Sequence, residues 1–106
     1  MSLFPGGRKR IDDGSYEYSL DDDAITQSMA EAMEGEMVVL FKKIKGQELP
    51  ATGRLDRRLL FVAVARGVLK YLRERQSDDI LVETVSGVSD HTHKVWLKIN
   101  LDCYET

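Results

Sequence analysis

The sequence has few of the residues that mark a disulfide-stabilised, membrane-spanning or secreted protein. Cys103 is the one cysteine among 106 residues, so no disulfide can form within the chain, and a lone thiol fits a reducing, cytoplasmic compartment. No apolar run approaches the roughly 18 residues that a membrane span needs. No apolar segment follows the basic cluster at residues 8–10. We therefore expect no membrane partner and no secretory signal.

Motifs of catalysis and cofactor binding are also missing. The sequence contains no nucleophile elbow, no phosphate-binding Walker loop, no dinucleotide-binding glycine fingerprint and no His-Glu-x-x-His pattern. We therefore expect that the protein is not an enzyme and that it needs no cofactor.

Charge of one sign does not dominate the chain. It has 15 Lys and Arg against 18 Asp and Glu, a net charge of −3, which excludes a uniformly basic nucleic-acid-binding protein. The charges are segregated, because residues 37–75 carry 10 basic and 3 acidic side chains, whereas residues 1–36 and 76–106 are both acidic. The pattern favours pairing of complementary segments, within one fold or between subunits. A basic surface for phosphate or an acidic partner is the alternative.

Two helices are predicted in the middle of the chain. The first spans residues 20–45 and stops at Gly46, and the second spans residues 54–76. The uninterrupted apolar run at residues 59–65 predicts that the second helix is central, with neighbours on several sides. The first helix has one apolar stripe, which comprises Ile25, Met29, Met33, Met37, Leu40, Phe41 and Ile44. We interpret this stripe as core, with an adaptable methionine-rich binding groove as the alternative.

Two strands are predicted near the end of the chain, at residues 80–85 and 92–103. The predicted fold class is therefore α+β, with two helices followed by a C-terminal antiparallel β-hairpin and preceded by a flexible N-terminal arm. The arm comprises residues 1–18, of which 16–18 could add a strand, and residues 19–106 form a single α+β domain.

A two-stranded hairpin is marginally stable and has exposed edges, which predicts a homo-oligomer. Trp96 lies between two lysines on the polar face of the second predicted strand, and tryptophan often anchors interfaces. We expect the interface to comprise Trp96, Lys94, Lys98, Tyr16 and Tyr18. A different protein partner is an open alternative. A small self-associating structural or interaction protein of this type suits a phage or prophage particle, or a bacterial accessory subunit.

Two further candidate sites remain. Asp90, His91 and His93 supply the ligand types that a transition metal prefers, although rim histidines near a turn are the simpler interpretation. The second predicted helix could bind nucleic acid through Arg57, Arg58, Arg66, Lys70 and Arg73. These arginines share no single stripe of the helix, so we do not expect nucleic acid as the partner.

Overall fold

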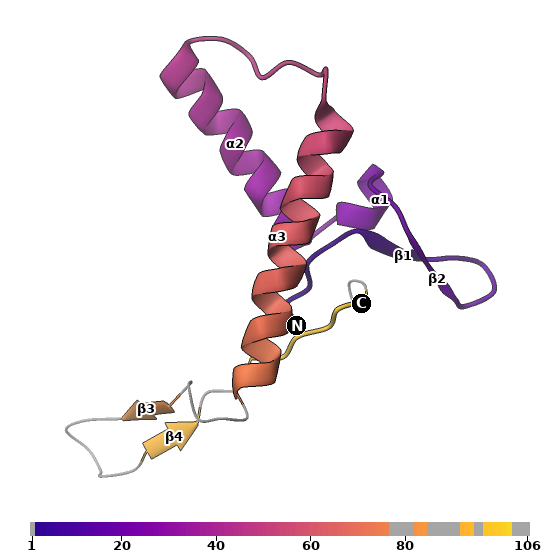
Figure 1. The fold of residues 1–106 in the computed structure, drawn as a ribbon, viewed down its shortest axis with the longest axis vertical. Coiled ribbons are helices and arrows are strands. Elements are labelled where there is room, and N and C mark those ends of the chain that lie inside the picture. The colour runs from indigo at the N-terminus through magenta and orange to yellow at the C-terminus, as the bar shows by residue number, and fades with distance from the viewer. Residues whose placement is uncertain (1, 77–81, 85–91, 95–96, 103–106) are drawn as a thin grey trace.

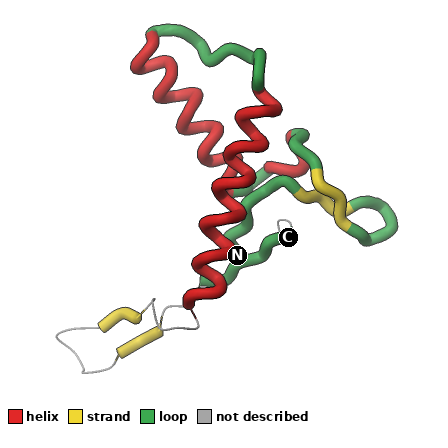
Figure 2. Tube along the Cα trace, in the orientation of Figure 1, coloured by secondary structure: helices red, strands yellow, loops and turns green. Residues whose placement is uncertain are grey.

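The structure is a computed structural model that describes residues 2–76, 82–84, 92–94 and 97–102. Two long helices dominate it, and they diverge from a contact near the start of the first toward the loop that joins them (Figure 1). Figure 2 shows one short pair of strands near the start of the chain and another beyond the end of the second long helix. The elements are β1 (Arg8–Arg10), β2 (Tyr16–Tyr18), α1 (Asp22–Ile25), α2 (Met29–Lys45), α3 (Arg54–Arg75), β3 (Val82–Thr84) and β4 (Thr92–Lys94).

The protein is α+β, as predicted, but the predicted order of its elements is wrong, because the chain begins with an antiparallel hairpin and the helices follow it. β1 pairs with β2, with Arg8 opposite Tyr18 and Arg10 opposite Tyr16. The two strands are joined by a tight turn in which Gly14 has a φ of +87°. The N-terminal segment is therefore not a flexible arm that precedes a helical domain.

The residues before β1 lie in the core. Phe4 is 4% exposed and Pro5 is fully buried. Their carbonyl groups accept hydrogen bonds from the backbone N–H groups of Met29 and Ala30, at 2.9 and 3.0 Å. These bonds use N–H groups in the first turn of α2, which have no partner within the helix. The segment thus acts as a backbone cap on α2, a role that no periodic apolar pattern reveals.

Two consecutive glycines allow this close approach. Gly6 and Gly7 have φ values of +99° and +91°, a conformation that favours glycine. A Cβ atom on Gly7 would lie 2.5 Å from Cγ1 of Val62, and one on Gly6 would lie 2.6 Å from Oγ of Ser28. The backbone of this segment therefore packs directly against α3 and the start of α2.

The predicted helix over residues 20–45 is divided in two. α1 ends at Ile25, and Gln27 adopts a φ of +62°. Ser28 then caps α2 by accepting a hydrogen bond on Oγ from the N–H of Glu31, while Oε1 of Glu31 accepts one from the N–H of Gln27. This Ser-x-x-Glu pattern is a capping signature, and it overrides the continuous apolar periodicity.

α3 buries one face, formed by Arg58, Val62, Ala65 and Leu69. Their spacing of four, three and four residues defines a single stripe. The expectation of neighbours on several sides is not met among the described residues. The buried apolar side chains there are Phe4, Pro5, Ala24, Ile25, Ala30, Val62, Ala65 and Leu69, a small core in which three members are alanine.

The end of the described chain lies beside its beginning. β3 pairs antiparallel with β4, with Val82 opposite Lys94. The predicted strand over residues 92–103 is not one regular element, because β4 ends at Lys94 and residues 97–102 run along the N-terminal segment instead. Leu3 donates a hydrogen bond to the carbonyl of Lys98 and accepts one from the N–H of Asn100.

Candidate interaction surfaces

An apolar groove runs along α2. It has a volume of about 600 Å³, and we call it the α2 groove. Its apolar walls are formed by Met29, Met33, Met37, Leu40, Phe41 and Ile44 of α2, with Phe61 of α3. Leu40 is 48% exposed and Ile44 is 75% exposed. The methionine-rich stripe that we interpreted as core therefore lines a groove open to solvent, apart from Ile25, which is buried.

The groove exists because α3 covers little of α2. Ala30 is the one buried residue of α2, which is described in full. Beyond its first turns, α2 leads away from α3 toward the loop at residues 46–53 (Figure 1). The apolar stripe continues over this uncovered length, so the helix presents to water a face that its sequence makes suitable for burial.

α3 has a second uncovered apolar face. Leu60, Val64, Val68 and Tyr71 are between 42% and 60% exposed. They are spaced at four, four and three residues, which places them on one side of the helix, opposite the buried stripe. Exposed apolar patches on both helices make these faces candidate interaction surfaces.

A second surface collects arginine and tyrosine side chains. The guanidinium group of Arg8 lies 5.1 Å from the ring centre of Tyr16 and 5.0 Å from that of Tyr18, and Arg66 lies 5.8 Å from the ring of Tyr18. Nη1 of Arg8 also donates a 2.6 Å hydrogen bond to Oδ1 of Asp102. The predicted interface residues of β2 thus meet a predicted nucleic-acid-binding residue of α3 in one cluster.

A polar pocket of about 580 Å³ adjoins this cluster. We call it the arginine pocket, and the side chains that define it are those of Arg8, Tyr16, Arg66, Arg73, Asn100 and Asp102. Arg66 and Arg73 are seven residues apart on α3, which places them on the same face of the helix. Sequence reasoning identified both but missed Arg8 and Asp102, because no local signal indicates that the two ends of the chain meet.

The other predicted nucleic-acid-binding residues lie elsewhere. Arg58 is 5% exposed. Its guanidinium donates to Glu34 at 2.8 Å, to Asp22 at 2.8 Å and to the carbonyl of Leu20. The hydrogen bond to Glu34 raises the pKa of Arg58, and the hydrogen bond from Arg58 lowers the pKa of Asp22. Arg58 therefore ties α1, α2 and α3 together. Lys70 is exposed on α3.

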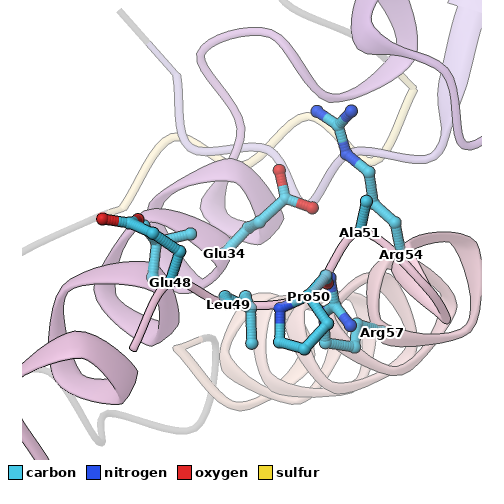
Figure 3. A pocket seen from close by; sticks show the side chains of 8 residues that line it. Glu34, Glu48, Leu49, Pro50, Ala51, Arg54 and Arg57 are labelled. Carbon is cyan, nitrogen blue, oxygen red and sulfur yellow. The ribbon is translucent and has the colours of Figure 1, made fainter. Parts of the chain in front are cut away.

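The crevice between α2 and α3 is closed by the loop that joins them. Figure 3 shows Glu34 and Glu48 on one side of this crevice, which measures about 240 Å³, and Arg54 and Arg57 on the other. Arg57 donates hydrogen bonds to the carbonyls of Thr52 and Pro50 at 2.9 and 2.7 Å. These side chains hold the loop in place, so the crevice is better explained as structural than as a binding site.

Several predicted site residues fall outside the described part of the chain. Asp90 and His91 of the candidate metal site and Trp96 of the candidate interface lie there. His93 and Lys94 belong to β4, and Lys98 is exposed. In the described ranges, no group of three or more His, Cys, Asp or Glu residues is placed to hold a metal ion. The metal site and the interface at these residues stay predictions.

The described helices include none that is both long and apolar enough to cross a lipid bilayer. No family model, no curated protein and no solved structure matches the chain. The function must therefore be argued from the surfaces themselves.

Proposed function

We propose that this chain is a self-associating subunit, and that a second copy docks on the α2 groove. The observation that carries the proposal is the apolar stripe of α2, which continues beyond the part of the helix that α3 covers and stays open to solvent. A helix that is amphipathic along its whole length but covered at one end favours a partner helix of similar character.

Charges on α2 favour a second copy as the occupant. The first half of the helix has three acidic residues, Glu31, Glu34 and Glu36, and its last turn has three lysines, Lys42, Lys43 and Lys45. Glu31 and Glu34 already accept hydrogen bonds from Gln27 and Arg58, which leaves Glu36 available. Two α2 helices that meet antiparallel about a two-fold axis would place Glu36 of each beside the partner subunit's Lys45. A parallel arrangement would bring like charges together.

The walls of the groove indicate a specific register. Glu36 and Lys45 are the two charged residues that line it. They lie equally far in sequence from the midpoint between Leu40 and Phe41. An antiparallel pair with its axis at that midpoint places Glu36 beside the partner subunit's Lys45, at both ends of an apolar centre. The same register places Met37 against the partner subunit's Ile44.

A charge-reversal cycle tests the proposal. Glu36→Lys and Lys45→Glu each replace two attractive contacts per dimer by repulsive ones, so each is expected to weaken association about tenfold, and the double variant is expected to restore it. Lys43→Glu is the matched control, because it makes the same charge change in the same turn outside the groove. Sedimentation equilibrium over a range of concentrations measures the dissociation constants.

The outcomes are distinct. A wild-type chain that stays monomeric at every concentration contradicts self-association. Association that is indifferent to Glu36→Lys and Lys45→Glu contradicts the proposed register.

The setting that we propose for such a subunit is a phage or prophage particle or a bacterial accessory assembly in the cytoplasm, because a chain with so small a core gains much of its stability from association.

A further inference from the structure

We infer that the arginine pocket binds a phosphate group carried by a small molecule. The pocket is formed by three segments that are distant in sequence: β1 with Arg8, α3 with Arg66 and Arg73, and the segment at residues 97–102. Three guanidinium groups and one carboxylate, that of Asp102, are among its defining side chains. The pocket is thus positively charged in a protein whose net charge is −3.

The arginines differ in how much of their hydrogen-bonding capacity is used. Arg8 donates from Nη1 to Asp102, while its Nε is buried and has no hydrogen-bond partner among the described residues. Arg66 donates from Nη1 to the carbonyl of Leu101 at 2.7 Å. An arginine has five N–H donors, and Arg66 makes no other hydrogen bond with the described residues. Arg73 makes no hydrogen bond or ion pair with the described part of the chain. The pocket therefore has unused donors on two fixed arginines and one exposed arginine.

This combination fits a phosphate better than a neutral ligand. A guanidinium group offers paired N–H donors that match two oxygens of a phosphate, and arginine is accordingly the preferred residue for such anions. The contacts of Arg8 with Tyr16 and Tyr18, and of Arg66 with Tyr18 and Leu101, hold these two groups in place before a ligand arrives. Preorganised donors lose less conformational entropy on binding.

The size of the pocket sets the class of ligand. A volume of about 580 Å³ lies within the range of pockets that hold small molecules and exceeds the needs of a bare phosphate ion. The three arginines of the pocket converge on one place, so the site suits one phosphate or pyrophosphate group rather than an extended backbone. The proposal is independent of self-association, because the pocket lies on the side of α3 that bears Arg66 and Arg73, away from the α2 groove.

Isothermal titration calorimetry with inorganic phosphate and with pyrophosphate tests this inference on the full chain. Binding is expected for both anions. Arg73→Ala is expected to weaken it about tenfold, without unfolding the protein, because Arg73 bonds to none of the described residues. Arg75→Ala is the matched control, since it removes the same charge from the same turn of α3 but its side chain lies over Tyr71 at 5.3 Å instead. This control is expected to leave the affinity unchanged.

Three results would overturn the inference. The first is no heat of binding with either anion at low salt. The second is equal weakening by Arg73→Ala and Arg75→Ala, which would indicate nonspecific attraction to the basic middle of the chain. The third is binding of a single-stranded oligonucleotide without any binding of phosphate or pyrophosphate, which would assign the arginines to nucleic acid. Circular dichroism of each variant confirms that the fold is retained.

Discussion

Replacing Leu40 and Ile44 together by alanine is the most direct perturbation of the α2 groove. Both side chains line the groove, and both are largely uncovered in the single chain, at 48% and 75% exposure. The double substitution therefore removes apolar surface of which the larger part is exposed in the single chain. The covered part of the two side chains corresponds to about 1–2 kcal/mol, so the free energy of unfolding is expected to fall by no more than that.

The expected effect on association follows from the exposed fractions. Full burial of a leucine or isoleucine side chain stabilises by about 1.5–3 kcal/mol. The fraction that remains exposed corresponds to about 1 kcal/mol for Leu40 and about 1.5 kcal/mol for Ile44 per subunit. Truncation to alanine removes most of this in both subunits, so the dimer loses about 4 kcal/mol, which is close to a thousandfold in the dissociation constant.

Sedimentation equilibrium and light scattering measure this change, and two controls accompany it. Leu59→Ala alters a residue that is 56% exposed on α3 but lies outside the groove, so association is expected to be unchanged. Leu69→Ala alters a fully buried residue and is expected to lower the free energy of unfolding by about 2–5 kcal/mol. If the Leu40 and Ile44 double variant associates as tightly as the wild type, the α2 groove is not the interface.

Three further predictions concern the fold. Arg58→Met is expected to destabilise the chain by about 3 kcal/mol in urea unfolding, because Glu34 loses its charged partner in a buried site; no loss would contradict this role. Arg58 also lowers the pKa of Asp22 below 3.8. The stabilisation that comes from the Asp22–Arg58 contact is therefore complete above about pH 4, and it is lost as the pH falls through the pKa of Asp22 in the folded chain. Acid unfolding monitored by circular dichroism should show a weaker pH dependence in Asp22→Asn. Gly7→Ala is expected to lower the free energy of unfolding by about 3 kcal/mol, because Gly7 has a positive φ and its new Cβ would clash with the side chain of Val62. Gly14 has a positive φ but open space around it, so Gly14→Ala is expected to cost about 1 kcal/mol. Equal losses of stability in the two variants would refute the clash.

Predictions from the sequence succeeded where the signal was local. The second predicted helix, residues 54–76, agrees with α3 (Arg54–Arg75) to within one residue, because apolar residues continue along it and Gly53 precedes it. The first predicted helix stops at Gly46, which adopts the left-handed conformation that glycine favours there. Its predicted start was wrong, although the Ser28-x-x-Glu31 capping pattern was present in the sequence.

Predictions failed where the signal came from distant contacts. The glycines near the start of the chain resemble turn residues, and we interpreted the segment as an arm. Their actual role is close approach, because Gly7 packs against Val62, 55 positions away in the sequence. A glycine that is needed for space is indistinguishable in sequence from one that is needed for a turn.

The sequence by itself determined where α3 lies, where α2 ends and which of their residues share a face, because capping and apolar periodicity act over a few residues. Only the tertiary structure decided which of those faces are covered. α3 diverges from α2, so the methionine-rich stripe lines an open groove instead of a core. The structure also brings Arg8 to Asp102 across 94 positions of sequence and completes the arginine pocket. Contacts between residues so far apart in the sequence depend on how whole segments pack, so local sequence patterns do not predict them.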